Sequence, residues 1–423
     1  MAPKTTLFPV HEATLSNGLR VRLVPDHDAP VASLYTFFQV GSRNERPGIT
    51  GISHLFEHMM FNGAKKYGPK EFDEVLESSG GRSNAYTTHD VTVYYEDFAA
   101  DALDTVLDLE SDRMRSLTID DRSLAREREV VKEERRLRVE NEPAGLMDEA
   151  LHALVYQAHP YRWPVIGYMG DIEAIDRKDC EDYFRTFYAP GNAVLWLAGD
   201  FDPASALKRI RKAYGDIRRG PPVPGVVRTE PEQRGERRAE LRQPAQAPSL
   251  VVAYRGPPVA SADTLVLDVL QYILGVGEGS RLQRSLVYAQ KLAVNVGVDW
   301  SWRKDPGTFS LHLELQPGAD PRVAEQALYA ELERVSRDGV EPREVEKARN
   351  NLRAHLLREL TSNSGRAHAL GTYETFLGSW RAGFRLPEAY GRIDAAQVQA
   401  AARQWLQPTQ RSVVTLVPEG AQA

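Results

Sequence analysis

Alternating apolar and polar positions near the start of the chain predict a β-hairpin followed by a more deeply buried strand. An Asn-Gly pair lies between apolar residues in segment 15–19, and this pair is typical of a tight hairpin turn. Segment 19–24 alternates apolar residues with arginine, and segment 32–40 is largely apolar. Gly48 and Gly51 interrupt the pattern before a short helix for which Ser53 is the candidate N-cap.

Further along the chain, strands and helices follow one another with short breaks. Period-two and compact apolar stretches predict strands, whereas apolar residues spaced by three and four positions predict helices. The expected strands are 84–87, 91–95, 193–198, 250–254, 295–302, 308–315 and 412–417. The expected helices are 72–76, 100–114, 122–139, 263–274, 280–288, 321–337 and 342–360.

The succession helix, proline, strand occurs twice, which indicates two related halves. Asp176 is followed by a helical segment, Pro190 and an apolar strand. Asp394 is followed in the same way by a helical segment, Pro408 and a strand. Fourteen residues separate the aspartate from the proline in both copies, and the copies are 218 residues apart.

Residues 218–248 separate the two halves and are rich in proline, glycine and charged residues, as is typical of an extended linker. The expected fold class is α+β, with two homologous domains, each a mixed or antiparallel β-sheet with helices packed on one face. The expected domains are 1–217 and 249–423.

Composition narrows the class of protein. A chain of 423 residues is longer than a domain with a single hydrophobic core usually is, so two or more domains are expected. A content of 42% hydrophobic and 26% charged residues is normal for a globular protein in water. A net charge of −6 gives no reason to expect nucleic acid, and no apolar run approaches the ~20 residues of a membrane span. No apolar leader is visible, so a cytoplasmic location is expected, or a periplasmic one if a signal peptide has been removed. The single Cys180 excludes an intrachain disulfide framework.

His54, Glu57 and His58 are the most distinctive chemical group in the chain. On a helix, histidines four residues apart share one face, and Glu57 lies beside them. Two such histidines can hold one zinc ion, and an adjacent carboxylate can take a proton from water at the metal. The order His-x-x-Glu-His inverts the commoner His-Glu-x-x-His. The alternative is a helix whose histidines only cap or cover the core.

A strongly charged helix near residues 122–139 carries carboxylates on its apolar face. At about 100° per residue, Glu127 and Glu134 share the face of Val131, whereas Glu133 points roughly 100° away from Glu134. A solvated charged face is the usual explanation of such a run. Burying an unpaired carboxylate is costly, however, and a metal with a histidine partner would compensate it.

Taken together, these segments resemble the inverted-motif zinc peptidases of the pitrilysin and mitochondrial-processing-peptidase family. The resemblance covers nearly the whole chain and is strongest in its first half. It implies a zinc-dependent endopeptidase subunit that hydrolyses peptides or unfolded polypeptide segments. The matching segments are 51–63, 80–87, 90–95, 127–134, 188–192 and 199–200.

The resemblance also implies roles for individual residues. The third zinc ligand of the family is a glutamate about 76 residues after the second histidine, and Glu134 lies 76 residues after His58. His54, His58 and Glu134 would then hold Zn²⁺, with Glu57 as the general base. Glu127 matches a supporting glutamate that orients a ligating histidine.

Asn84 and Ala85 match the edge strand to which an extended peptide adds in the family. The chain departs from the family in its second half, where active members carry an arginine and, seven residues later, a tyrosine. Helix 286–294 places Val287 and Val294 there, and Tyr288 is one residue out of register.

The resemblance therefore implies a heterodimer with a related, metal-free subunit that supplies the arginine and tyrosine, or alternatively a homodimer. The alternative function is a catalytically weak or inactive scaffold or peptide-binding subunit of a larger assembly. The eight other histidines are expected to be structural or surface residues.

Overall fold

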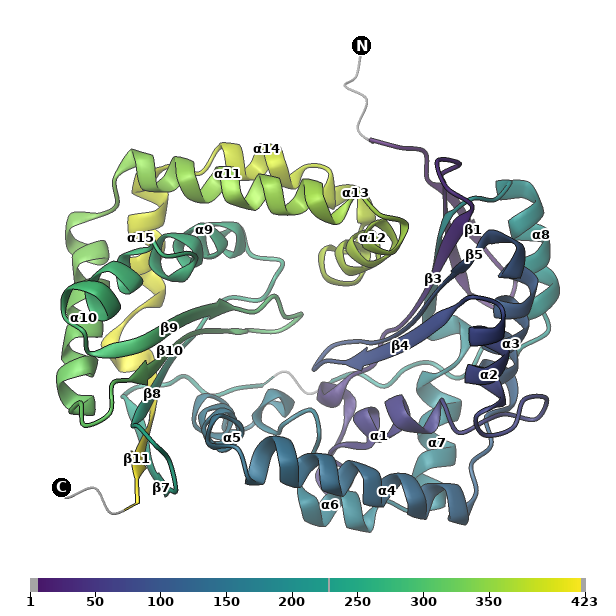
Figure 1. The fold of residues 1–423 in the computed structure, drawn as a ribbon, viewed down its shortest axis with the longest axis horizontal. Helices are drawn as coiled ribbons and strands as arrows, with labels where there is room; N and C mark the ends of the chain where they lie inside the picture. The colour runs from purple at the N-terminus through teal and green to yellow at the C-terminus, as the bar shows by residue number, and fades with distance from the viewer. Residues whose placement is uncertain (1–6, 227–228, 420–423) are drawn as a thin grey trace. The chain divides into compact units, whose positions relative to one another are not determined.

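The computed structural model describes residues 7–226 and 229–419, which form two compact units (Figure 1). We call them the first and second unit. Each contains one segment from the other half of the sequence. The described residues of the first unit are 7–135, 163–226 and 357–384, and those of the second are 136–162, 229–356 and 385–419.

A six-stranded sheet organises the described part of the first unit, in the order β1-β2-β6-β3-β5-β4. β2 and β6 pair in parallel, and all other neighbours pair antiparallel. The expected hairpin is confirmed, because β1 and β2 pair across a turn in which Gly18 has a φ of 90°. The strands are β1 (His11–Thr14), β2 (Arg20–Pro25), β3 (Val31–Phe38), β4 (Arg82–Thr87), β5 (Thr92–Ala99) and β6 (Ala193–Gly199).

Helices pack on both faces of this sheet, whereas the sequence led us to expect them on one face only. Phe37 of β3 points toward α12, where a Cβ on Gly371 would come within 2.1 Å of its ring, so glycine permits the close approach. Phe38 points the other way and packs on the rings of Tyr94 and Tyr188. The helices of the first unit are α1 (Ile52–Met59), α2 (Glu71–Ser78), α3 (Leu103–Ser116), α4 (Asp121–Arg135), α6 (Met169–Ala174), α7 (Arg177–Phe187), α8 (Pro203–Tyr214), α12 (Asn363–Leu377) and α13 (Trp380–Gly383).

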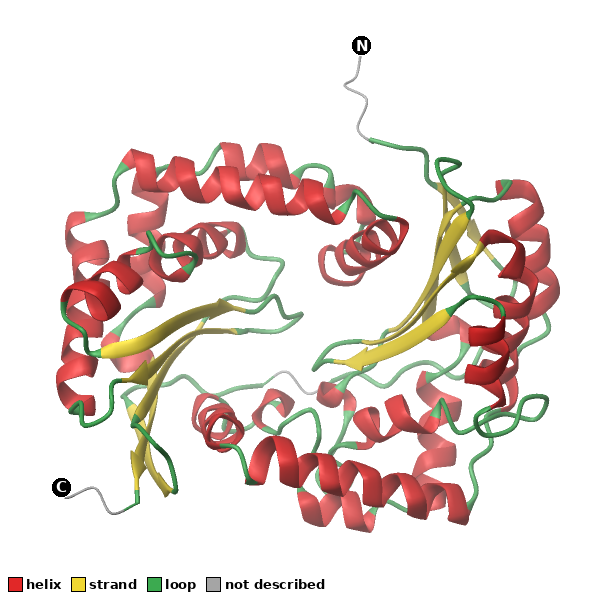
Figure 2. Cartoon of the chain, viewed as in Figure 1, coloured by secondary structure: helices red, strands yellow, loops and turns green. Residues whose placement is uncertain are grey.

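The second unit repeats this architecture with a five-stranded sheet, in the order β7-β11-β8-β10-β9 (Figure 2). β7 and β11 are parallel and the other neighbours antiparallel, as in β2-β6-β3-β5-β4. The strands are β7 (Arg237–Gln243), β8 (Ser249–Arg255), β9 (Ala293–Trp300), β10 (Thr308–Leu315) and β11 (Arg411–Pro418). The helices are α5 (Pro143–Val155), α9 (Asp263–Gly275), α10 (Pro321–Asp338), α11 (Pro342–Glu359), α14 (Leu386–Gly391) and α15 (Ala395–Trp405).

The internal duplication is confirmed at the level of caps and turns. α7 and α15 both begin at an aspartate that accepts a hydrogen bond from the backbone N–H three residues later, at 2.8 Å. Both helices are followed by a 3-10 turn that begins at a proline, Pro190 or Pro408, and then by a strand of the sheet. The α+β class with two related sheets is therefore confirmed.

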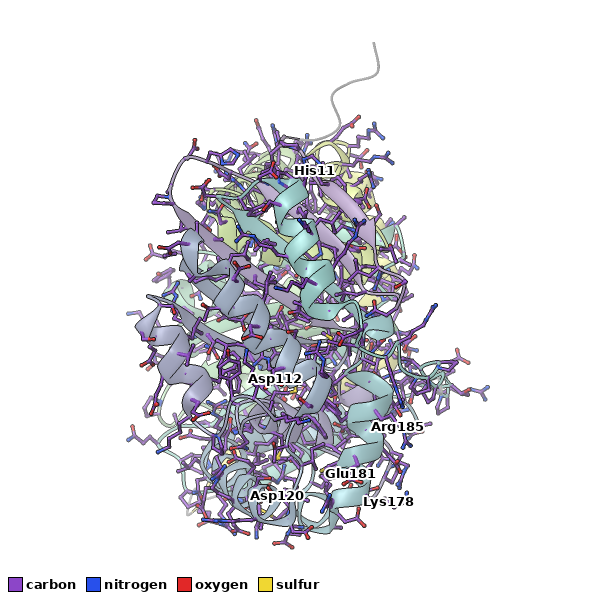
Figure 3. All side chains as sticks on the ribbon, turned by 90° about the vertical axis from the view of Figure 1, so that its right-hand side faces the viewer. His11, Asp112, Asp120, Lys178, Glu181 and Arg185 are labelled. Atoms are coloured by element: carbon purple, nitrogen blue, oxygen red, sulfur yellow. The ribbon has the colours of Figure 1, made fainter. Side chains whose placement is uncertain are left out.

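α7 shows how one amphipathic helix serves this fold. Its charged residues Lys178, Glu181 and Arg185 are exposed (Figure 3). Cys180 and Tyr183 lie on the opposite, buried side of the helix. This buried side faces α1, which carries the candidate chemistry.

Two segments differ from their expected conformation. Arg237–Gln243, within the expected linker, forms β7 and pairs with β11. Ala239 and Leu241 are partly buried and alternate with exposed charged residues, so the segment was too polar for its strand periodicity to be recognised in the sequence. The expected helix 286–294 ends as a π-helical segment at Ala289, since Lys291 adopts a positive φ of 53°, and Val294 belongs to β9. Residues 227–228 of the linker and residues 1–6 lie outside the described residues.

In the described ranges, no helix has the length and apolar character needed to cross a membrane.

Asp268 is a buried carboxyl on α9 of the second unit. It accepts hydrogen bonds from Trp302 Nε1 at 3.0 Å and from the hydroxyl of Tyr390 at 2.6 Å. Burial raises the pKa of Asp268 to about 7, and these two donors oppose the rise. The folded state therefore holds this proton more tightly than the unfolded chain does, whose aspartates titrate near about 3.9.

Asp268→Asn removes this titration and should change how stability depends on pH. The contribution of the neutral carboxyl is present at pH 4 and is lost as the pH rises through about 7. Relative to the variant, the free energy of unfolding of the unmodified protein should fall by up to about 4 kcal/mol between pH 4 and pH 8. Urea denaturation of both proteins measures this, and a difference independent of pH would contradict it.

Candidate metal centre

α1 holds the candidate ligands against the sheet of the first unit. Phe56 is buried on its inner face, with its ring 5.6 Å from that of Tyr183 and 5.0 Å from that of Tyr188. The hydroxyl of Tyr94 on β5 donates to the carbonyl of Phe56 at 3.0 Å. These contacts fix the rotation of the helix, which leaves His54, Glu57 and His58 on its half-buried side.

α4 brings a carboxylate to the same place. Glu134 Oε2 lies 3.2 Å from His58 Nε2 and 3.7 Å from His54 Nε2. The three side chains each offer a ligand atom, and these atoms lie within 4.8 Å of one another. In residues 7–226 and 229–419, no other group of three or more His, Cys, Asp or Glu side chains is arranged in this way.

The separations fit a zinc ion. Tetrahedral bonds of about 2.0–2.2 Å place neighbouring ligand atoms about 3.3–3.5 Å apart, and the measured 3.2 and 3.7 Å lie on either side of that spacing. Two imidazole nitrogens and one carboxylate oxygen form a donor set typical of catalytic zinc, which keeps a fourth position open. His54, His58 and Glu134 are therefore suited to Zn²⁺.

The two other carboxylates considered on α4 lie on different faces of the helix, as its periodicity predicts. Glu133, next to Glu134, is exposed, whereas Glu127 is buried. Glu127 Oε2 lies 3.9 Å from His58 Nδ1, the ring nitrogen that faces away from Glu134. Of the two histidines, the structure thus places Glu127 beside His58.

Burial and neighbouring charges shift the pKa values of two side chains on α1, Glu57 and His58. Burial raises the pKa of Glu57, and the Glu134 carboxylate acts in the same direction, whereas Thr87 and the His58 ring oppose it. Burial by itself would lower the pKa of His58, but the Glu134, Glu57 and Glu127 carboxylates together outweigh burial and raise the pKa. A proton and a metal ion therefore compete for the His58 ring.

β4 runs beside α1 at the edge of the sheet. Asn84 is exposed, and its side-chain oxygen accepts the backbone N–H of Ala85 at 2.8 Å. Thr87, at the end of the strand, is close enough to influence Glu57. An edge strand with available backbone groups thus ends next to the candidate base.

Comparison with known proteins places this chain in a family. The family model described as Insulinase (Peptidase family M16) matches residues 20–168, and the model described as Peptidase M16 inactive domain matches residues 174–352. Zinc protease PqqE of Helicobacter pylori is 31% identical over 371 residues, which are 86% of this chain and 84% of that protein. The chain belongs to the M16 peptidase family.

Further comparisons agree with membership of the M16 family. The probable mitochondrial-processing peptidase subunit beta of Arabidopsis thaliana is 26% identical over 421 residues, 95% of this chain and 76% of that protein. The crystal structure of a protease from Helicobacter pylori superposes with a TM-score of 0.94 at 28% identity and covers 98% of this chain and 100% of that chain.

The second unit of this M16 chain lacks the ligands at the corresponding place. Thirty residues separate the starts of α1 and β4, and thirty also separate those of α9 and β9. Counted from the helix start, α9 carries Leu265, Asp268 and Val269 where α1 carries the two histidines and the glutamate. Of the three side chains, only the carboxyl group has a counterpart in the second unit. This is Asp268, which accepts hydrogen bonds from Trp302 and Tyr390.

The structure also places the residues expected to replace the arginine and tyrosine of active M16 members. Val287 is half-buried in the π-helical segment Gln283–Ala289. Val294 is 53% exposed on the edge strand β9, and Tyr288 is 54% exposed. Neither valine can donate a hydrogen bond from its side chain.

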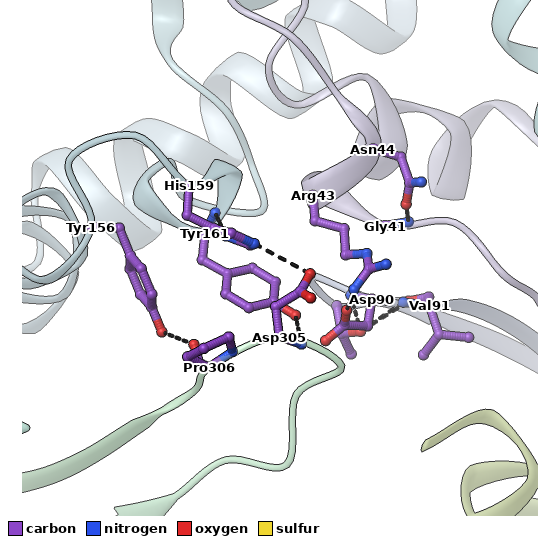
Figure 4. A network of polar contacts seen from close by, with 11 residues as sticks. Gly41, Arg43, Asn44, Asp90, Val91, Tyr156, His159, Tyr161, Asp305 and Pro306 are labelled. Atoms are coloured by element: carbon purple, nitrogen blue, oxygen red, sulfur yellow. Dashed lines mark hydrogen bonds and ion pairs between the residues drawn. The ribbon is translucent and has the colours of Figure 1, made fainter. Parts of the chain in front are cut away.

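Among the other histidines, His159 has a clear structural role in the second unit. Its Nδ1 accepts the backbone N–H of Tyr161 at 3.1 Å, so Nε2 carries the proton and donates to Asp305 at 3.2 Å (Figure 4). The hydroxyl of Tyr156 donates to the carbonyl of Pro306 at 2.7 Å. These bonds attach the loop between β9 and β10 to the segment after α5.

Sequence reasoning missed the residues that support α1. Ser53, expected as its N-cap, lies inside the helix with its hydroxyl 2.6 Å from that of Tyr183. The N-cap position is Gly51, and the carboxyl group that caps the helix belongs to Glu45. The aromatic residues of segment 91–95 and of α7 were visible in the sequence, but their contact with Phe56 depends on the fold.

Adjacent glutamates allow a matched test of the ligand set. Glu134→Gln should lose most of its zinc, because an amide is a poor replacement for a carboxylate ligand. Glu133→Gln should keep about one zinc per chain, because that side chain is exposed on another face of α4. Metal analysis of chelator-free proteins measures both, and equal zinc contents in the two variants would exclude Glu134 as a ligand.

Proposed function

We propose that this chain is the zinc-bearing subunit of a metalloendopeptidase that hydrolyses peptides or unfolded polypeptide segments. The observation that carries the proposal is the convergence of His54, His58 and Glu134, with Glu57 on the same helix. Relatives named zinc proteases, from Helicobacter pylori and Bacillus subtilis, support the choice of metal.

The side chains divide the chemistry among them. His54, His58 and Glu134 would hold the zinc ion, which would supply Lewis-acid polarisation of the substrate carbonyl. Glu57 takes the proton from the attacking water and passes it to the leaving amine, a task that suits a carboxyl whose pKa is raised. Glu127 restrains the His58 ring through Nδ1.

β4 offers a binding mode for the peptide backbone. An extended chain can pair with the free edge of the strand, and the Ala85 N–H, now bonded to the Asn84 side chain, is the donor it would take over. Main-chain pairing depends little on side chains, so it suits substrates of varied sequence. The scissile bond would lie near the Thr87 end of β4, beside Glu57.

Glu57→Gln tests the assignment of the base. The variant keeps the size of the side chain but cannot accept the proton, so kcat should fall by about 10²–10⁴-fold. Zinc content should remain about one per chain, because Glu57 is not among the three ligands. Cleavage of a quenched fluorescent peptide measures the rate, with Glu133→Gln as the control. Undiminished hydrolysis by Glu57→Gln would refute this mechanism.

We propose further that the working enzyme is a heterodimer. Val287 and Val294 cannot supply the polar contacts to the substrate carbonyl that the family resemblance leads us to expect, so a related metal-free subunit would supply an arginine and a tyrosine. A homodimer is the alternative arrangement. Location in the cytoplasm, or alternatively in the periplasm, stays a prediction.

Activity with and without a partner tests this arrangement. The purified chain alone should hydrolyse peptide slowly. Addition of a related subunit that has arginine and tyrosine but no His-x-x-Glu-His should raise kcat/KM by at least about tenfold, since one lost transition-state contact typically costs that much or more. Full activity of the chain alone, abolished by Glu57→Gln, would remove the need for a partner.

The same valines favour a second candidate function, a peptide-binding subunit that holds zinc but hydrolyses poorly. Such a subunit would contain about one zinc per chain and bind an extended peptide at β4. It would show no turnover with or without a partner. A scaffold without metal would contain no zinc at all.

A further inference from the structure

The first turn of α1 has an unusual cap. Gly51, at the N-cap position, has a φ of 90°, and a Cβ there would come within 2.3 Å of the carbonyl oxygen of Ile166. The serine, threonine, asparagine or aspartate side chain that normally caps a helix from this position is therefore excluded sterically. Ser53 offers no substitute, because it lies inside the helix, and its hydroxyl bonds to Tyr183 and also interacts with Glu45 itself.

Glu45, from outside the helix, supplies the missing acceptors. Its Oε2 accepts the backbone N–H of Gly51 at 2.9 Å, and its Oε1 accepts the backbone N–H of Ser53 at 2.8 Å. The side chain is almost fully buried, and burial raises its pKa to about 8, while the N–H groups of Ser53 and Gly51 act in the opposite direction. A buried carboxyl is costly unless such donors compensate it.

The backbone that carries Glu45 is itself held in place. Glu45 follows the 3-10 turn Ser42–Asn44, whose first carbonyl accepts Trp163 Nε1 at 2.8 Å. Arg43 donates to Asp90 at 2.9 Å, and the Asn44 side chain accepts the N–H of Gly41 at 3.1 Å (Figure 4). The cap is therefore a rigid part of the first unit.

We propose that Glu45 is a positioning residue that orders the first turn of α1 and thereby sets His54 at the metal. His54 directly follows Ser53, whose N–H Glu45 holds, whereas His58 lies a full turn further along the helix. Loss of the cap should loosen His54 and leave the packing of Phe56 intact. This inference rests on the proposed zinc site.

Glu45→Gln tests the role, because it keeps the volume of the side chain but leaves only one oxygen to accept two N–H groups. We expect zinc to bind about tenfold more weakly, as when the support of a ligating histidine is removed. We also expect kcat to fall with little change in KM, since the peptide contacts at β4 are separate. Competition with a chromogenic chelator and peptide hydrolysis measure these two effects.

Asp202→Asn is the matched control. Asp202 caps α8 by accepting the N–H of Ser205 at 2.8 Å, and α8 carries none of the candidate site residues. Asparagine also caps helices, so Asp202→Asn should lower thermal stability only slightly and should leave zinc affinity and kcat unchanged. If Glu45→Gln does the same, Glu45 is only structural and the proposal is overturned.

Amide hydrogen exchange separates this inference from the zinc site. Glu45→Gln should speed exchange of the amides of residues 53–55 relative to residues 58–60, whether or not metal is present. If the unmodified chain binds no zinc, the proposed function fails, while hydrogen exchange still decides whether Glu45 orders the first turn. Unchanged exchange would overturn the proposal even if zinc binds. If Glu45→Gln does not fold, Glu45→Asp, whose shorter side chain cannot reach both N–H groups equally well, should show the same effects at smaller size.

Discussion

The packing of α1 against the sheet and α4 is the constraint on which the candidate site depends. Glu134 is 76 residues from His58 along the chain, so only tertiary packing can bring their side chains within 3.2 Å. The buried Phe56 ring and the bond from Tyr94 to its carbonyl fix both the depth and the rotation of the helix. Because interiors are close-packed, these contacts hold the backbone of α1 in place against the sheet.

The charges at the site point to a cation as strongly as the distances do. Glu57, Glu127 and Glu134 gather around two imidazoles, and burial, together with the neighbouring Glu134 carboxylate, raises the pKa of Glu57. Like charges gathered at one half-buried place are unfavourable unless cations compensate them. Because the site is half-buried, water screens the repulsion between the carboxylates less well there, and a compensating cation is needed more.

Much of the local structure could be predicted from the sequence, because it depends on periodicity. The hairpin at Gly18 and the face of α4 that carries Glu134 required only turn chemistry and helical angles. The cap of α1 could not be found in this way. Whether Gly51 can carry a side chain depends on the backbone of Ile166, more than a hundred residues away, and so the acceptor Glu45 was missed. We also did not predict that α5, from the first half of the sequence, belongs to the second unit, or that α12, from the second half, belongs to the first. Both assignments depend on tertiary packing, which periodicity along the chain does not reveal.

The duplicated fold shows that one backbone arrangement accommodates two different solutions for a buried carboxyl. In α1, Glu57 lies among ligands suited to a cation, whereas at the same distance from the helix start Asp268 of α9 is bonded by Trp302 and Tyr390. The uncharged hydrogen-bond donors of Trp302 and Tyr390 stabilise the Asp268 carboxyl, so that no metal ion is needed to compensate it. The sheet and helices therefore specify where the carboxyl lies, and the residues around it decide whether it supports stability or chemistry. The asymmetry between the units is a consequence of side chains and requires no difference in fold.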